Sequence, residues 1–174
     1  NIITYNCYME SYCMTGHFEK ARGIVGQILA SGLHPDSYTI AIYIKGCKYF
    51  KSGDVFSAQK EIFDCYVNST CRDKIVINSL IDQCISSNDD EMTAKIFDQM
   101  RNGSLGIEPD NVTYNIMLKF AVKNRDIDMA SSLINDMAAK TFRPNLSTYN
   151  SLLNLCLKLQ RHDSAVFFYQ KMKE

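Results

Sequence analysis

The chain has 174 residues and no net charge, because its 19 lysines and arginines are balanced by 19 aspartates and glutamates. Apolar residues make up 46% of the composition, which is enough for a buried core and unlike the composition of a disordered chain. No apolar run approaches the roughly 18 residues that a membrane-spanning helix needs, so we expect no membrane partner.

A four-residue phrase recurs along the chain. Residues 3–6 read ITYN, residues 112–115 read VTYN and residues 147–150 read STYN, with weaker copies at 38–41 and 75–78. The copies start at positions 3, 38, 75, 112 and 147, so the steps between them are 35, 37, 37 and 35 residues. A period of this length is typical of a supersecondary unit stacked on copies of itself, and it predicts a repeat protein.

Each copy of the phrase opens a predicted pair of amphipathic helices. Polar turns separate the two helices of successive pairs at 15–17, 51–54, 87–90, 123–126 and 160–163. In the fourth pair, apolar residues follow the helical period through both helices, at Tyr114, Met117, Leu118, Ala121 and Val122 and then at Ala130, Leu133, Ile134 and Met137. Proline followed by Asp or Asn ends one pair and caps the next, at 35–36, 109–110 and 144–145. No alternating strand pattern competes with the helical one, so the predicted fold is all-α.

The seven cysteines form no Cys-x-x-Cys pair, and none of the three histidines stands at ligand spacing from such a pair. We therefore expect no metal site and no cofactor, and we interpret the cysteines as small apolar side chains between helices. The sequence also lacks a nucleophile–histidine–acid set and a glycine-rich phosphate loop. The chain itself is predicted not to be an enzyme.

The phrase VTYN, the short polar turn, the small residue Ala130, Met137 and the closing Pro144-Asn145 together resemble the pentatricopeptide repeat, a helix–turn–helix unit. The resemblance covers the whole chain as a single array, with units 2–36, 37–73, 74–110 and 111–145 and a partial unit 146–174. It implies a right-handed α-solenoid. The tetratricopeptide repeat has a similar period, but its pattern contains a tryptophan and this chain has none.

The resemblance implies sequence-selective binding of single-stranded RNA, with one base for each repeat. In this family the fifth residue of a unit contacts the base edge together with the last residue of the same unit. The implied base-reading pairs are Asn6 with Asp36, Ala41 with Asp73, Asn78 with Asp110 and Asn115 with Asn145, while Asn150 has no partner in this chain. An amide carries the donors and the acceptor that a pyrimidine edge requires. Asn with Asp resembles a uridine reader and Asn with Asn a cytidine reader that tolerates uridine, whereas Ala41 leaves its unit undefined.

The family also places apolar residues at the second position of each unit, where successive units sandwich a base. Ile3, Ile75 and Val112 fit this role. Tyr38 is expected to stack on a base, because aromatic stacking tolerates any base, and Ser147 would leave a looser clamp.

Two lysines near the ends of predicted first helices, Lys123 and Lys158, are expected to approach the RNA phosphates. The alternative interpretation is that they complement the negative ends of helix dipoles. Helix capping is likewise an alternative role for the closing Asp and Asn residues. We expect the recurring asparagines to line the inner wall of the superhelix and to stay open to solvent.

The balanced charge is unlike that of most nucleic-acid-binding domains, which have a basic excess. A second hypothesis is therefore a protein–protein interaction scaffold of the same fold, in a ribosomal, transcription or RNA-processing complex. A scaffold is expected to expose an apolar patch on the inner face, where an RNA reader exposes polar side chains. The resemblance implies a mitochondrion or a chloroplast, where the protein would act in RNA processing, stability, editing or translation. The chain begins at Asn1 without a targeting segment, so we expect it to be a segment of a longer protein.

Overall fold

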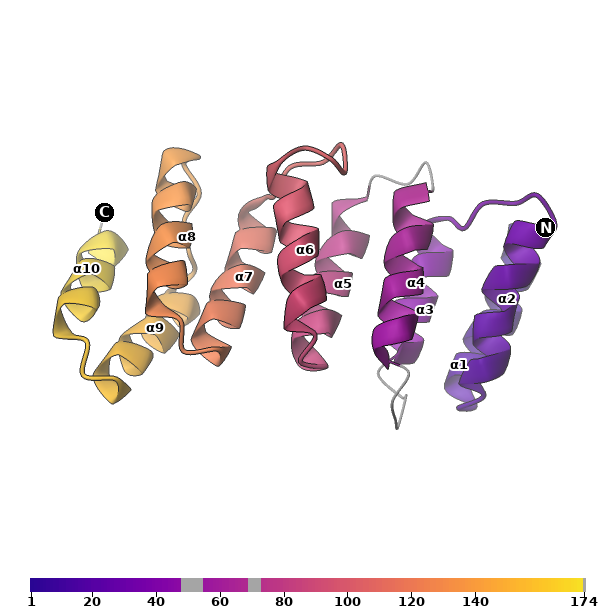
Figure 1. Cartoon of the computed structure of the whole chain (residues 1–174), viewed down its shortest axis with the longest axis horizontal. Coiled ribbons are helices and arrows are strands. Elements are labelled where there is room, and N and C mark those ends of the chain that lie inside the picture. Colours follow the sequence, from indigo (N-terminus) through magenta and orange to yellow (C-terminus); the bar gives the residue numbers. More distant parts are fainter. Residues whose placement is uncertain (48–54, 69–72, 174) are drawn as a thin grey trace. The chain divides into compact units, whose positions relative to one another are not determined.

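The computed structural model describes residues 1–47, 55–68 and 73–173, and within these ranges all regular structure is helical (Figure 1). The helices are α1 (Ile2–Met14), α2 (Phe18–Ala30), α3 (Ser37–Cys47), α4 (Val55–Asn68), α5 (Lys74–Ser86), α6 (Asp90–Arg101), α7 (Asn111–Lys123), α8 (Ile127–Ala139), α9 (Leu146–Lys158) and α10 (His162–Lys173). The all-α prediction is confirmed. None of the described helices is both long enough and apolar enough to cross a lipid bilayer.

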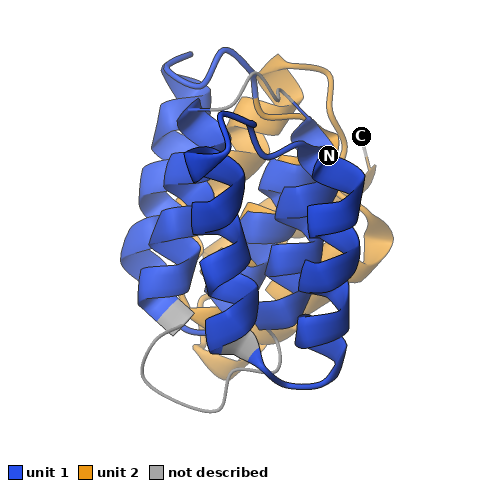
Figure 2. Cartoon of the chain, turned by 90° about the vertical axis from the view of Figure 1, so that its right-hand side faces the viewer, with its two compact units in different colours: residues 1–108 blue, residues 109–174 orange. Residues whose placement is uncertain are grey.

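The chain forms two compact units, unit 1 at Asn1–Glu108 and unit 2 at Pro109–Glu174 (Figure 2). In unit 1, α1, α3 and α5 pack side by side as one layer, and each packs against the helix that follows it. Figure 1 shows those following helices, α2, α4 and α6, in front of that layer. In unit 2, α7 packs against α8 and α9, and α9 packs against α10. We call α1, α3, α5, α7 and α9 the first helices. The single array and its repeat boundaries remain predictions.

Short polar side chains begin many of the helices. The side chains of Asn1, Asp73, Asp89, Asp110, Asp126 and Asn145 each accept a hydrogen bond from a backbone N–H of the following first turn. Such a cap typically contributes about 1 kcal/mol. The caps that follow junction prolines at 109 and 144 are those that the sequence predicts.

Four of the five predicted turns lie within the described residues, at 15–17, 87–90, 123–126 and 160–163, and each separates two helices there. The turn predicted at 51–54 lies outside the described residues. Each of the four contains a residue with positive φ, namely Gly16 at 75°, Asn88 at 61°, Arg125 at 58° and Gln160 at 55°. This left-handed conformation is a common way to end a helix.

The core is built from the apolar faces that the periodicity predicts. Eight of the nine apolar residues predicted for the fourth helix pair are buried, and the ninth, Val122, is only partly buried because it lies in the last turn of α7. Cys13, Cys47, Cys84 and Cys156 are buried as well, and burial raises the pKa of the Cys13 thiol to about 11 and that of Cys47 to about 12. These thiols stay protonated and pack as apolar groups. The prediction that the cysteines are small apolar side chains between helices is wrong for Cys7, which is exposed. Cys71 lies outside the described residues.

Candidate nucleic-acid interface

One large apolar side chain near the start of four first helices is exposed. Ile3, Tyr38, Ile75 and Val112 are 67%, 57%, 76% and 55% exposed, and each holds the second position of its predicted unit. We call this set the apolar row; its first three members lie in unit 1 and Val112 lies in unit 2. A residue two positions later lies about 200° around the helix and faces the core, as Tyr114 does. Exposed apolar groups that recur at one place indicate a contact surface.

The exposed face of each first helix continues from the apolar row in steps of three or four residues. Its charged members are Glu10 in α1, Lys45 in α3, Asp82 in α5, Lys119 and Lys123 in α7 and Lys158 in α9. In unit 2 these charges are all basic, whereas in unit 1 they alternate in sign. Lys45 and Lys119 are not among the phosphate-contacting residues predicted from the sequence. Each stands seven residues, or two helical turns, after a member of the apolar row, and this spacing was the available signal.

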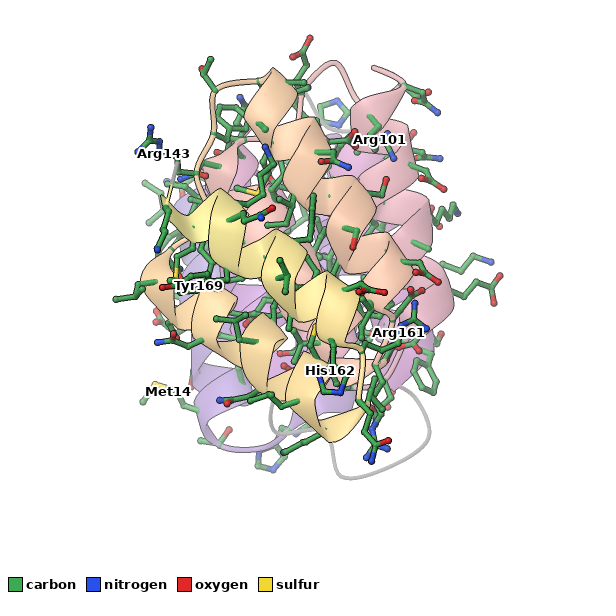
Figure 3. All side chains as sticks on the ribbon, turned by 90° about the vertical axis from the view of Figure 1, so that its left-hand side faces the viewer. Met14, Arg101, Arg143, Arg161, His162 and Tyr169 are labelled. Atoms are coloured by element: carbon green, nitrogen blue, oxygen red, sulfur yellow. The ribbon has the colours of Figure 1, made fainter. Side chains whose placement is uncertain are left out.

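The predicted phosphate-contacting residues, Lys123 and Lys158, are exposed in the last turns of α7 and α9. In that place they complement the negative end of the helix dipole, whether or not RNA is bound. Other cations of unit 2 lie at the two ends of α9, where Figure 3 shows Arg143 and Arg161. The guanidinium of Arg161 lies 3.3 Å from the Asp128 carboxylate, and an exposed pair of this kind adds little stability.

The recurring asparagines lie beside the exposed face of the first helices. Each follows the second position of its unit by three residues, which turns it by about 60° around the helix. Asn6 and Asn78 are 3% and 7% exposed, Asn115 is partly exposed and Asn150 is exposed. The expectation that these asparagines stay open to solvent is therefore wrong for Asn6 and Asn78. The physical reason is visible at Asn6, whose edge of α1 is covered by the first turn of α3.

In unit 1 the start of α3 holds the amide of Asn6. Its Oδ1 accepts a hydrogen bond from Thr39 Oγ1 at 2.7 Å, and its Nδ2 donates to Asp36 Oδ1 at 3.4 Å. Asp36 also caps α3 by accepting from the Thr39 backbone N–H at 2.7 Å. Burial alone would raise the pKa of Asp36, but the hydrogen bonds from Thr39 and Asn6 outweigh burial and lower this pKa below its usual value. Asp36 is therefore an ionised acceptor at neutral pH.

In unit 2 the corresponding positions meet in a different arrangement. Asn115 Oδ1 accepts from the Asn145 backbone N–H at 3.2 Å and from Thr148 Oγ1 at 3.3 Å. The Nδ2 of Asn115 donates to the carbonyl oxygen of Asn111 at 2.7 Å. The Asn145 side chain caps α9 by accepting from the Thr148 backbone N–H at 2.8 Å. Asn145 therefore contacts Asn115 through its backbone, whereas Asp36 contacts Asn6 through its side chain.

Two of the four predicted base-reading pairs are thus in contact, one in each unit. Ala41 is partly buried and offers no polar side-chain group to a base. Asn78 belongs to unit 1, whereas its predicted partner Asp110 belongs to unit 2. The closing residue of every pair accepts a hydrogen bond from a backbone N–H of the next helix, as seen for Asp36, Asp73, Asp110 and Asn145. The capping interpretation is confirmed for all four, and base contact would be an additional role.

Comparison with curated proteins finds relatives that are much longer than this chain. A mitochondrial 15S rRNA processing factor, CCM1 of Yarrowia lipolytica, is 27% identical over 92% of the chain and 21% of its own length. A chloroplastic pentatricopeptide repeat-containing protein of Arabidopsis thaliana is 23% identical over 100% of the chain and 22% of its own length. The small ribosomal subunit protein mL103 (rPPR7) of Arabidopsis thaliana is 25% identical over 95% of the chain and 39% of its own length. The chain therefore spans about a fifth to two fifths of these relatives.

Comparison with solved structures finds the same fold. The PPR domain of Arabidopsis thaliana protein-only RNase P 1, solved in complex with tRNA, superposes with a TM-score of 0.71 at 17% identity, over 95% of this chain and 86% of that one. The pentatricopeptide repeat protein PPR10 from maize superposes with a TM-score of 0.66 at 22% identity, over 99% of this chain and 24% of that one. At these identities the likeness establishes the fold, an all-α solenoid of helix–turn–helix repeats.

The family assignment comes from sequence models of the repeat. The model described as the PPR repeat family matches residues 1–48, 72–122 and 109–158, and the model described as the PPR repeat matches residues 147–174. Together they cover most of the chain, and the helix pairs and polar turns occur where such repeats need them. The chain belongs to the pentatricopeptide repeat family.

Proposed function

We propose that this chain binds single-stranded RNA along the exposed face of its first helices, with one base for each repeat and a preference for pyrimidines. The observation that carries the proposal is the apolar row, whose exposed side chains recur at one position of four successive repeats. In three of these repeats the predicted base-reading pair is Asn–Asp or Asn–Asn, and Tyr38 stands in the repeat of Ala41. Flat bases offer apolar faces to the row and hydrogen-bonding edges to the amides. The proposal places the protein in a mitochondrion or a chloroplast, in the processing, stability, editing or translation of a transcript.

The proposed base order follows from the pairs. Units with Asn and Asp take uridine, the unit with Asn and Asn takes cytidine or uridine, and the unit of Ala41 has no preference. The preferred strand is therefore uridine, any base, uridine, then cytidine or uridine, followed by a pyrimidine at Asn150. Because Asn6 is buried beneath the start of α3, contact between its amide and a base requires this junction to open. Asn115 and Asn150 are already accessible and need less rearrangement.

Related proteins support an RNA ligand. Maize PPR10, solved in complex with an 18-nt psaJ RNA element, superposes with a TM-score of 0.51 at 19% identity over 99% of this chain and 30% of that one. The relative from Yarrowia lipolytica is named for the processing of a 15S rRNA. We assign the chain an RNA-binding role without catalysis and without a cofactor. Within the described residues no three His, Cys, Asp or Glu side chains gather as metal ligands.

A second candidate function is a protein–protein scaffold in a ribosomal or RNA-processing complex. It is favoured by the same exposed apolar row together with the burial of Asn6 and Asn78, because a scaffold is expected to show apolar rather than polar groups. The balanced charge points the same way. One relative, mL103, is a ribosomal subunit protein. The recurrence of the row at one position of four repeats favours RNA, because the bases of a single strand recur at a regular spacing.

The first test compares a U/C-rich with an A/G-rich oligonucleotide by fluorescence anisotropy at one fixed salt concentration. We expect tighter binding of the U/C-rich strand, and we expect Asn115→Ala with Asn150→Ala to reduce that preference. Each lost base-edge hydrogen bond is worth about a two- to tenfold change in affinity. The matched control is Asn135→Ala, which removes an exposed amide from the second helix α8.

Equal binding of both strands would contradict base reading. An equal loss of preference in the Asn135→Ala control would contradict the assignment to the first helices. If neither strand binds, the scaffold hypothesis is the better account of the exposed apolar row.

A second test concerns the basic face of unit 2. Replacing Lys119 and Lys123 by glutamine is expected to weaken RNA binding while leaving the base preference unchanged, because phosphate contacts carry no sequence information. The slope of log K against log salt should become shallower by about 1.4, since each phosphate neutralised on a single strand contributes about 0.7. Titrations at several salt concentrations measure this slope.

The charge-matched control replaces Lys60 and Lys95 by glutamine. Both lysines are exposed, and they lie on α4 and α6, the helices that follow the first helices α3 and α5. We expect this control to keep the slope of the unmodified protein. A slope that falls equally in both double variants would mean that RNA is held by overall charge and not by the first helices.

A further inference from the structure

The structure repeats one contact that the base-reading scheme does not include. Thr39 Oγ1 lies 2.7 Å from Asn6 Oδ1 in unit 1, and Thr148 Oγ1 lies 3.3 Å from Asn115 Oδ1 in unit 2. In both cases the threonine stands 33 residues after the asparagine, in the first turn of the next first helix. Both threonines are buried, so neither hydroxyl is placed to touch a base.

This contact decides which end of the amide faces the threonine. A carboxamide has an acceptor at one end and two donors at the other, in nearly the same shape, so its neighbours set its orientation. At Asn115, the Asn145 backbone N–H donates to Oδ1 at 3.2 Å, and the Thr148 hydroxyl lies 3.3 Å from the same Oδ1. The Thr148 hydroxyl also lies 2.8 Å from Asn145 Oδ1, so its single proton is shared between these two amide oxygens. The reversed amide would point its NH2 group at the Asn145 N–H, so that two donors would face each other.

The junction in unit 1 fixes the same orientation in another way. The Thr39 hydroxyl lies 2.7 Å from Asn6 Oδ1 and also 2.7 Å from Asp36 Oδ1, so its single proton is shared between these two acceptors. The ionised Asp36 carboxylate faces Asn6 Nδ2 at 3.4 Å. Reversing the amide would place its oxygen against the carboxylate oxygen, which is repulsive. Both junctions therefore commit Oδ1 to the following repeat. The NH2 group donates to Asp36 in unit 1 and to Asn111 in unit 2, and it is the group that the asparagine would offer to a ligand.

We propose that Thr39 at the start of α3 and Thr148 at the start of α9 are positioning residues that determine base specificity. Each orients the asparagine of the preceding repeat so that this asparagine presents an N–H donor to the base. This inference rests on the proposed function. A fixed donor selects a base edge with an acceptor at the matching place. An asparagine free to reverse could present either an acceptor or a donor, and the repeat would lose discrimination.

The test uses Thr148, because Asn115 is the more accessible of the two asparagines. Thr148→Val keeps the side-chain shape and the backbone N–H that completes the α9 cap, but it removes the hydroxyl. Thr148→Ser keeps the hydroxyl and serves as the matched control. Affinities are measured by anisotropy for four RNAs that differ only at the base opposite the Asn115 unit.

We expect the unmodified protein and Thr148→Ser to share one order of base preference, and Thr148→Val to lose about three- to tenfold of the ratio between the best and the worst base. The mean affinity over the four RNAs should change less than this ratio. A purely structural threonine would lower all four affinities together and leave the ratio intact. That result would overturn the proposal.

A measurement without RNA separates this inference from the proposed function. In the free protein, the side-chain amide resonances of Asn115 in a 15N NMR spectrum should shift in Thr148→Val and stay in place in Thr148→Ser. Unchanged resonances in Thr148→Val would overturn the positioning role whatever RNA does. If the unmodified protein binds all four RNAs equally, the proposed function fails, and the specificity role fails with it. If both the unmodified protein and Thr148→Val prefer the same base to the same degree, only the role of the threonine fails.

Discussion

Replacing Gly46 by alanine is expected to destabilise unit 1, although the same change in most helices is stabilising. Gly46 lies in α3, and a Cβ at this position would stand 2.5 Å from Cys13 Sγ and 3.4 Å from Cys13 Cβ. Cys13 is buried, so its sulfur has little room to move. Overpacking of this kind costs about 1–3 kcal/mol, which exceeds the roughly 1 kcal/mol that alanine gains over glycine in helix propensity. We expect the free energy of unfolding to fall by about 2 kcal/mol for an overlap this severe. Urea denaturation, monitored by far-UV circular dichroism, measures this change in the free energy of unfolding.

The chain contains its own control for this prediction. Gly23 and Gly26 lie in α2, and a Cβ at either position would meet nothing within 4 Å. Alanine at Gly23 or Gly26 should raise the free energy of unfolding by about 0.5–1 kcal/mol. Adding Cys13→Ala to Gly46→Ala removes the overlapping sulfur and should recover most of the loss. If Gly46→Ala stabilises the protein as Gly23→Ala does, α1 and α3 are not as close as described.

The close approach of α1 and α3 also bears on the proposed RNA-binding face. Gly46 meets Cys13 near the ends of these two helices, and Asn6 meets Asp36 and Thr39 near their beginnings. One inter-helix distance thus sets both the packing at Cys13 and the burial of Asn6. A repeat that reads a base with Asn6 must widen the start of this interface, whereas Gly46 keeps its end closely packed.

The sequence predicts the parts of this structure that depend on position along a helix. The 3.6-residue period identifies the buried face of α7 and α8, because each side chain's direction follows from its place in the turn. The repeat period pairs Asn6 with Asp36 and Asn115 with Asn145, since both members of a pair stand near the starts of successive first helices.

The burial of Asn6 and Asn78 could not be predicted in this way. A helical period gives the angle at which a side chain leaves its helix, but not how closely the next helix approaches that edge. For a residue about 60° from an exposed face, a small change in inter-helix distance decides between exposure and burial. The threonine contacts depend on the same distance: the recurring phrase shows that the threonine is repeated, but not which side chain it contacts. Lys119 is a different case, because its two-turn spacing from Val112 was available and only the family's phosphate position was considered.

The largest expected loss of stability comes from Tyr114→Ala, at about 3–5 kcal/mol. Tyr114 is 1% exposed in the core of unit 2, and its ring lies 6.0 Å from the ring of Phe142 between centroids. The Lys140 ammonium lies over the same ring at 6.0 Å. Alanine removes both ring contacts and leaves a cavity that the helices α7 and α8 fill only in part. Tyr114→Phe keeps the ring and should cost much less, and urea denaturation separates the two variants.

Tyr38→Ala provides the contrast, because Tyr38 belongs to the exposed apolar row. Tyr38 holds the same position in α3 that Val112 holds in α7, and Val112 stands two residues before the buried Tyr114. Two residues turn the helix by about 200°, so tyrosines in these two places serve opposite faces. We expect Tyr38→Ala to change the free energy of unfolding by less than about 0.5 kcal/mol and to weaken RNA binding by about 1–3 kcal/mol, the value of one stacked base. If Tyr38→Ala lost stability but kept its RNA affinity, both parts of this prediction would be wrong. The Tyr38 side chain would then contribute to core packing and not to the exposed contact surface.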